Sequence, residues 1–191
     1  MTAANVHPRA RLLLDFWFAD DVVAGQKWFK SDPTFDRKIR DQFAEDYKKA
    51  ARGEYDSWLN TAASALALVI ALDQFPRNLF RAMARAYESD VMAQMVAAIA
   101  VDRGLDRKLP PQRRLFLYLP FEHAENPALQ STSVALISPL EKDLPGIAHY
   151  AERHAAVIQE FGRFPHRNAV LGRASTPAEL EYLAKTPSEF G

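Results

Sequence analysis

Two short segments of the sequence bring together side chains that can carry acid–base and anion-binding chemistry. The first, "LDQFPRN" at 72–78, contains Asp73, Arg77 and Asn78. The second, "GRFPHRN" at 162–168, repeats the order Phe-Pro followed by Arg-Asn and adds a histidine. Proline ends one helix and can begin the next, so both segments are predicted to lie at the C-terminal ends of helices. A repeated helix–turn solution explains this order, and a buried polar site fed by both segments is the hypothesis we pursue.

The carboxylate of Asp73 is the residue in these segments that most needs an explanation. Residues 62–72 have no polar face, so their helix should be surrounded by protein on every side. Asp73 then extends from a buried helix, in the last turn, where the helix dipole disfavours an anion. A buried ionised carboxylate is tolerated only when it is paired or bound to a metal. The candidate partners are Arg77, Arg163 and Arg167, and a purely structural ion pair is the alternative.

Histidines supply the candidate acid–base groups. In "FEHAE" at 121–125, Glu125 could hold the tautomer of His123 in an acid–base pair, or both could serve as caps and ion pairs. His154 shares a stripe with Tyr150 and Ile158 and is expected to face inward, although a core histidine without a chemical role is the simpler interpretation. The residues assigned to catalysis under this hypothesis are His123, Glu125, His154 and Asp73.

The second Phe-Pro segment offers an anion site. Residues 165–168 are predicted to open a short helix, whose free backbone N–H groups could bind a carboxylate or phosphate with help from His166 and Arg167. Arginine pairing with carboxylates of the protein itself would use the same groups. The residues assigned to ligand binding are Arg77, Asn78, Arg163, His166, Arg167 and Asn168.

Helix signals recur along the chain and predict how these residues are positioned. Asp32 precedes a proline and a stretch with apolar residues every fourth position, which ends at Gly53. Asn126 likewise precedes a proline and is expected to cap the helix that follows. Thr176 and Glu179 form a capping-box pattern, and no segment alternates in the manner of a strand. Short connections rich in proline and glycine are typical of antiparallel helical neighbours. We therefore expect one all-α domain over 1–191, built from antiparallel helical hairpins with about seven to nine helices.

Composition excludes several classes of function. The 24 basic and 24 acidic residues balance, so the chain has no global charge that would attract nucleic acid or an acidic membrane. Cysteine is absent, which excludes disulfides and thiolate chemistry. The longest uncharged apolar stretch, 62–72, is too short for a membrane span, and the N-terminus has no secretory pattern. We expect a soluble cytoplasmic protein.

Cofactor and metal motifs are also missing. The chain has no glycine-rich phosphate loop, no nucleophile elbow and no His-Glu-x-x-His motif, so no cofactor or metal is predicted. A metal-dependent alternative would use nitrogen and oxygen ligands suited to zinc or iron. Its ligands would come from His123, Glu125, His154, His166 and Asp73.

Four phrases together resemble a known family. They are "WFKSDPTFDRKIRDQF", "LDQFPRNLFR", "LFLYLPFEHAE" and "FGRFPHRNAVLGRASTPAE". The resemblance is to DUF924, a bacterial family of unknown function, and it covers almost the whole chain. It implies a helical fold like that of tetratricopeptide repeats, in a right-handed array, and almost nothing about activity. The chain departs from the family pattern at 81–87, where the family tends to read Arg-Gly-Thr-Pro-Arg-Ala-Phe, and at Ala124 and Leu129. A site that uses those positions would be altered here.

Three classes of function remain open from the sequence. The one we favour is a buried polar pocket that binds a small anionic molecule or a carboxylate-bearing peptide. The second is a hydrolase or lyase with His123 or His154 as general base and Asp73 or Glu125 to orient it. The third is a helical scaffold for another protein, in which the buried charges are purely structural. The sequence does not predict an oligomeric state.

Overall fold

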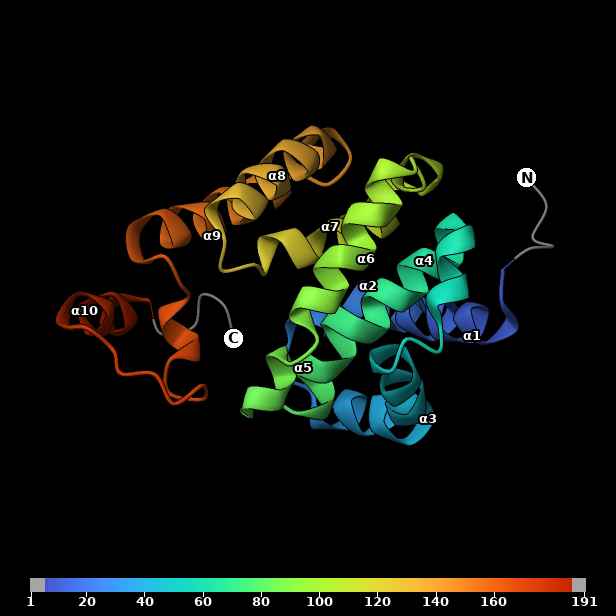
Figure 1. The fold of residues 1–191 in the computed structure, drawn as a ribbon, viewed down its shortest axis with the longest axis horizontal. Helices are drawn as coiled ribbons and strands as arrows, with labels where there is room; N and C mark the ends of the chain where they lie inside the picture. Colours follow the sequence, from blue (N-terminus) through green and yellow to red (C-terminus); the bar gives the residue numbers. More distant parts are fainter. Residues whose placement is uncertain (1–5, 187–191) are drawn as a thin grey trace.

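The computed structural model describes residues 6–186, and every regular element in that range is helical (Figure 1). This confirms the all-α class, and the eight helices of eight or more residues in the described range match the expected seven to nine, while the right-handed tetratricopeptide-like arrangement stays a prediction. The α-helices are α1 (Pro8–Trp17), α2 (Asp20–Gly25), α3 (Pro33–Ala51), α4 (Ala62–Val69), α5 (Phe75–Leu79), α6 (Asp90–Asp102), α7 (Pro111–Glu122), α8 (Pro127–Ile137), α9 (Ile147–Phe161) and α10 (Pro177–Lys185). Short 3₁₀ turns connect them, including Ala84–Tyr87 before α6 and Pro165–Arg167 after α9.

The predicted helix starts are confirmed by their capping hydrogen bonds. The side chain of Asp32 accepts hydrogen bonds from the first backbone N–H groups of α3, and Asn126 does the same for α8. At α10, Thr176 and Glu179 form the reciprocal capping box. The local pattern of the sequence therefore determines where these helices begin.

Helix α4 is the centre of the fold. Residues 64–76 are all buried, as their apolar composition predicts, and α4 packs against α1, α6 and α7 (Figure 1). One large hydrophobic core surrounds α4, and a smaller one lies where Val157, Ile158 and Phe164 meet between α9 and the segment that follows it. Figure 1 shows α10 at the opposite end of the molecule from α1.

The first Phe-Pro segment does not end its helix, contrary to the prediction. A π-helical turn, Ile70–Gln74, joins α4 to α5, and the rod continues through Pro76. Proline lacks an N–H, and its ring would crowd the carbonyl four residues earlier, which belongs to Leu72. The wider π turn relieves this conflict, and the hydroxyl of Ser89 donates to the Leu72 carbonyl at 2.6 Å. The chain thereby keeps a proline inside a buried helix.

The second Phe-Pro segment behaves as predicted. Helix α9 ends at Phe161, Gly162 takes the left-handed conformation with φ of 71°, and Pro165–Arg167 forms a short 3₁₀ turn. Glycine adopts that conformation without strain, which explains the stop.

The departures from the family pattern fall at different places in the fold. Ala82 adopts a left-handed backbone with φ of 59°, a conformation that favours glycine. Ala124 is buried and Leu129 packs against the main core, so both are structural positions.

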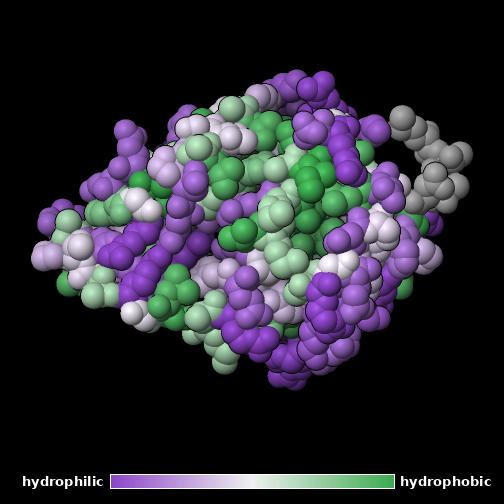
Figure 2. Space-filling view, in the orientation of Figure 1, coloured by the Kyte–Doolittle hydropathy of each residue, from purple (hydrophilic) through white to green (hydrophobic). Residues whose placement is uncertain are grey.

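The viewed surface is mainly hydrophilic, with hydrophobic residues over α6 (Figure 2). Val91 and Met95, both on α6, are 65% and 60% exposed. Among the described residues, no helix is long and apolar enough to cross a membrane.

Candidate functional site

Eight ionisable side chains from five parts of the chain form one connected group, which we call the polar cluster. The rod α4–α5 contributes two of them, the start of α6 one, the end of α7 two, α9 one, and the 3₁₀ turn after α9 two. The members are Asp73, Arg77, Asp90, Glu122, His123, His154, His166 and Arg167. Residues of both Phe-Pro segments therefore lie in one polar cluster.

Asp73 and His123 form the innermost pair of the polar cluster. Asp73 is completely buried, and its Oδ1 lies 2.8 Å from Nδ1 of His123, the residue that caps the C-terminus of α7. The amide of Gln74 donates to the other carboxylate oxygen. Burial opposes ionisation, but Arg77, His123 and these hydrogen bonds together hold the pKa of Asp73 below its ordinary value. Because the carboxylate can only accept, Nδ1 of His123 carries the proton and Nε2 keeps its lone pair.

The turn after α7 is held in place by a buried amide. Nε2 of Gln130, on α8, donates to the backbone carbonyls of Glu122 at 2.7 Å and Ala124 at 2.8 Å. These are carbonyls that the end of a helix leaves without intrahelical partners. Gln130 therefore fixes the chain reversal that presents Glu122 and His123 to the polar cluster.

Arg77 is fully committed to partners within the protein. Its guanidinium donates to both carboxylate oxygens of Asp90, at 3.0 and 3.2 Å, and to the backbone carbonyl of Asp73. It also lies 3.4 Å from the Asp73 carboxylate. Burial disfavours its charge, but the two aspartates outweigh burial and raise its pKa. This confirms that Arg77 is a partner of Asp73.

Arg167 is held firmly but paired poorly. Its guanidinium lies over the rings of Phe164 and Tyr87, 4.5 and 4.6 Å from their centroids. Within residues 6–186, its one hydrogen bond is a long contact of 3.4 Å from Nη1 to Asp90, and its buried Nε has no acceptor. Burial and the nearby charge of Arg77 lower its pKa. Arg167 is thus a buried cation with unused donors.

Glu122 and His154 form a contact between two uncharged groups at neutral pH. Burial, helped by the charge of Asp73, raises the pKa of Glu122 to about 8. Burial also lowers the pKa of His154 to about 3, although its Nδ1–H donates to the carbonyl of Tyr150 at 2.8 Å. The 3.4 Å separation between His154 Nδ1 and Glu122 Oε1 is therefore a polar contact and not an ion pair. Oε2 of Glu122 is buried without a hydrogen bond from any described residue.

His166 is a further neutral imidazole of the polar cluster. Burial, followed by the charge of Arg167, lowers the pKa of His166 to about 4. Burial and the charge of Arg77 also lower the pKa of His123, against the opposing effect of Asp73. The charges of the polar cluster are thus two aspartates and two arginines.

Several residues assigned to the site from sequence have other roles. Glu125 does not orient His123: it receives two hydrogen bonds from Arg173, at 2.6 and 2.9 Å, and one from the N–H of Phe164. The carboxylate that holds His123 is Asp73. Arg163 is not a partner of Asp73 either, because it pairs with Glu179 at 2.6 Å.

The two asparagines are also structural. Asn78 donates to Asp36 at 2.8 Å, and Arg81 binds the same carboxylate. Asn168 accepts a hydrogen bond from Arg173 at 2.9 Å. Tyr150, expected on the inward stripe with His154, is 56% exposed.

Sequence reasoning missed Asp90, Tyr87 and the separate role of Glu122. Asp90 resembles an ordinary acidic residue in the first turn of α6, and only the packing of α6 against the π turn brings it to Arg77. Glu122 precedes His123 directly, but its burial depends on how α7 packs. No local pattern distinguishes these residues.

Within the described part of the chain, no group of three or more His, Asp or Glu residues is arranged to hold a metal ion. The five residues of the metal-dependent alternative are therefore not gathered as a ligand set: Glu125 pairs with Arg173 and the other four belong to the polar cluster.

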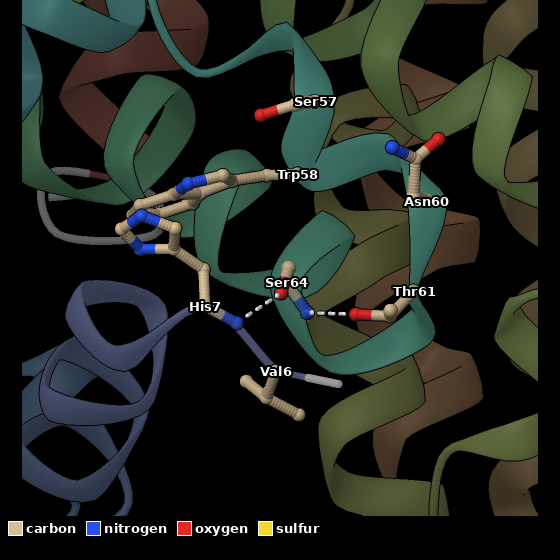
Figure 3. A pocket seen from close by; sticks show the side chains of 7 residues that line it. All are labelled: Val6, His7, Ser57, Trp58, Asn60, Thr61 and Ser64. Atoms are coloured by element: carbon tan, nitrogen blue, oxygen red, sulfur yellow. Dashed lines mark hydrogen bonds between the residues drawn. The ribbon is translucent and has the colours of Figure 1, made fainter. Parts of the chain in front are cut away.

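Two surface pockets lie away from the polar cluster. The first, of about 320 Å³, is lined by Val6, His7, Ser57, Trp58, Asn60, Thr61 and Ser64 (Figure 3). His7 caps α1 by accepting from the N–H of Arg9, and its backbone N–H donates to Ser64. The second lies beside it, between α4 and the start of α7, and includes Lys108 and Arg113.

Comparisons with known proteins agree with the fold. The family model described as "Bacterial protein of unknown function (DUF924)" matches residues 13–187. A solved structure, that of protein of unknown function ATU0120 from Agrobacterium tumefaciens, is similar with a TM-score of 0.83 and 42% sequence identity. The similarity covers 92% of this chain and 97% of that one. No curated protein matches the chain in sequence. The chain belongs to the DUF924 family of bacterial proteins of unknown function.

Proposed function

We propose that the polar cluster binds the carboxylate or phosphate group of a small molecule, or the carboxylate of a peptide, with Arg167 as the principal binding residue. The observation that carries the proposal is the state of Arg167, which is buried and fixed in position but has a single long hydrogen bond within the described residues. A buried charge normally has close partners, because its desolvation is costly.

The geometry of Arg167 suits an anion. A guanidinium presents five N–H donors in a planar fork that matches the oxygens of carboxylate or phosphate. The rings of Phe164 and Tyr87 offer the guanidinium cation–π contacts but no hydrogen-bond acceptors. An incoming anion would supply the acceptors that Nε and the remaining donors lack.

The carboxylate of Asp90 does not supply the acceptors that Arg167 lacks. Asp90 is the one carboxylate that contacts Arg167 within residues 6–186, and Arg77 already binds both of its oxygens at shorter distances. Moving Asp90 toward Arg167 would weaken its contacts with Arg77. Arg77 and its two aspartate partners are therefore structural, and Arg167 is the residue of the polar cluster that binds the anion.

Glu122 gives the proposal a pH dependence. Burial is the main reason that His154 and His166 have pKa values of about 3 and 4, so both imidazoles stay uncharged between pH 6 and pH 8. Burial and the charge of Asp73 raise the pKa of Glu122 to about 8, so this carboxyl group is uncharged at pH 6 and partly anionic at pH 8. An anionic Glu122 repels a second anion in the polar cluster, and affinity is therefore higher at pH 6 than at pH 8.

The test measures the melting temperature with sulfate, inorganic phosphate and succinate at pH 6 and pH 8, for the wild type, Arg167→Met and Arg163→Met. Arg163→Met is the matched control, because it removes a guanidinium of the same segment that pairs outside the polar cluster. An anion at 100 times its Kd stabilises the native state by about 2.7 kcal/mol. We expect that gain in the wild type and in Arg163→Met, and its loss in Arg167→Met.

Sulfate and phosphate also stabilise proteins through exclusion from the surface, so the difference between variants is the informative quantity. Equal anion-dependent shifts in the wild type and Arg167→Met would refute the proposal. A stronger shift at pH 8 than at pH 6 for sulfate, whose charge is constant in this range, would refute the coupling of anion binding to the protonation of Glu122.

A further inference from the structure

We infer that the polar cluster also transfers protons: His123 acts as general base and Glu122 as general acid on a small carbon acid whose carboxylate or phosphate is held by Arg167. Asp73 is a positioning residue for His123. This inference rests on the proposed function, because Arg167 must anchor the substrate.

The hydrogen bond from His123 to Asp73 prepares His123 to accept a proton. Asp73 Oδ1 lies 2.8 Å from His123 Nδ1, and Gln74 and Arg77 fix the carboxylate from its other sides. The proton on Nδ1 leaves Nε2 as an acceptor, and the ionised carboxylate stabilises the imidazolium formed when Nε2 takes a proton. The His123 side chain is 16% exposed, in contrast to the fully buried Asp73.

The acid is the second carboxyl group of the site. Glu122 is 5% exposed and its Oε2 has no hydrogen bond from the described residues, so its environment favours the protonated form. Asp73 is ionised and Glu122 is protonated, and neighbouring carboxyl groups in different protonation states are typical of sites in which one of them acts as a general acid. Glu122 contacts His154, whose ring centroid lies 6.5 Å from that of His123, so the proposed acid and base belong to one group of neighbouring side chains.

Other groups of the polar cluster surround Asp73 and Glu122 and influence their titration. Both charged and neutral groups face them from the rod α4–α5, α6, α9 and the turn after α9. These groups are Arg77, Asp90, His154, His166 and Arg167.

The chemistry of the step is enolisation. The C–H bond next to a carbonyl breaks, its proton goes to Nε2 of His123, and its electron pair moves toward the carbonyl oxygen. Glu122 gives its proton to that oxygen, which produces an enol, an imidazolium and a carboxylate. Reversal restores the carbonyl and both side chains, and no oxidant or further reactant is needed.

Nucleophilic catalysis is less well supported by the same residues. The chain contains no cysteine, and the hydroxyl of Ser89, next to Asp90, donates to the Leu72 carbonyl. The cluster therefore offers proton transfer and electrostatic anchoring.

The experiment follows exchange of carbon-bound hydrogen for deuterium in D₂O by proton NMR. The probes are 2-oxobutyrate, which carries a carboxylate, and dihydroxyacetone phosphate, which carries a phosphate. Loss of the signal of the CH₂ group next to the carbonyl should proceed at least tenfold faster with wild-type protein than in buffer, for at least one probe. The probe that responds identifies which anion the site prefers.

The variants separate chemistry from folding. His123→Gln should return exchange to the buffer rate, and Glu122→Gln, which replaces a neutral carboxyl by a neutral amide of the same shape, should slow it at least tenfold. His149→Gln is the control, because His149 is an exposed histidine of α9 outside the cluster, and it should leave the rate unchanged. Asp73→Asn should displace the pH at which exchange is half-maximal, whereas a purely structural role would lower the rate equally at every pH.

The outcomes are distinguishable from those of the binding test. If a probe raises the melting temperature of the wild type but not of Arg167→Met, and the wild type gives no exchange above buffer, proton transfer is refuted and anion binding stands. If exchange persists in His123→Gln with a normal melting temperature, the assignment of the base is refuted. If neither probe nor any simple anion binds, the proposed function fails and this inference fails with it.

Discussion

The two Phe-Pro-Arg-Asn segments have nearly the same residues and different structures. In the first, the π turn carries the helix through the proline, and Arg77 meets two aspartates. In the second, glycine stops the helix and a 3₁₀ turn places Arg167 against two aromatic rings with one long polar contact. The difference teaches that a shared motif does not imply a shared role: one arginine completes the core and the other is left with unused donors.

The largest effect should come from removing the satisfied arginine. Arg77→Ala leaves Asp73 buried with less compensation for its charge, and we expect a loss of about 3–5 kcal/mol in the free energy of unfolding. Arg167→Met should change it by about 1 kcal/mol or less, or increase it, because the variant removes an incompletely paired buried charge. Urea unfolding at pH 7 measures both. Comparable losses in the two variants would erase the distinction between the segments.

The second largest effect is a pH dependence of stability caused by Glu122, whose carboxyl group stays protonated at neutral pH, unlike that of Asp73. Its pKa is about 8 in the folded protein, above its ordinary value near 4.5, so between those pH values the folded state binds the extra proton. Stability is therefore lost as the pH rises through this window, and the loss is complete above pH 8. Glu122→Gln abolishes that loss, so the variant should exceed the wild type by a few kcal/mol (about 2 or more) at pH 9 and match it near pH 5.

The check is the difference in free energy of unfolding between Glu122→Gln and the wild type at each pH from 5 to 9. A difference that does not change with pH would mean that Glu122 is ionised throughout, and would remove the proposed acid.

The π turn should respond to loss of its external hydrogen bond. Ser89→Ala leaves the buried Leu72 carbonyl without the hydroxyl that replaces the missing N–H of Pro76. An unsatisfied buried acceptor costs about 1–3 kcal/mol. Thermal unfolding of Ser89→Ala, with Ser131→Ala on the exposed side of α8 as control, measures this. An unchanged melting temperature would show that the turn does not depend on Ser89.

The smallest effect concerns the segment that joins α5 to α6. Ala82 has φ of 59°, and glycine takes this conformation without the steric penalty of a Cβ atom. Ala82→Gly should therefore stabilise the protein, by about 0.5–1 kcal/mol after the greater freedom of glycine in the unfolded chain is included. A destabilised variant in chemical denaturation would contradict the strain at this position.

Much of the local structure could be predicted, and the site in part. The caps at Asp32, Asn126 and Thr176 were predictable because each depends on a few neighbouring residues. Arg77 could be named as a candidate partner of Asp73 because it lies only four residues away, although the continuous helix that joins them was not predicted. Glu125 was assigned wrongly because spacing along a helix says nothing about Arg173, which arrives from 48 residues away.

The sequence by itself determined the all-helical class, the helix starts and the need for Asp73 to be compensated, because hydrophobic period, capping groups and buried charge act over a few residues. Only the tertiary structure decided which arginine would be satisfied and which carboxyl would stay protonated. Those outcomes depend on solvent exclusion and on Coulomb forces between side chains that are remote along the chain, as with Asp90 and Arg167, 77 residues apart.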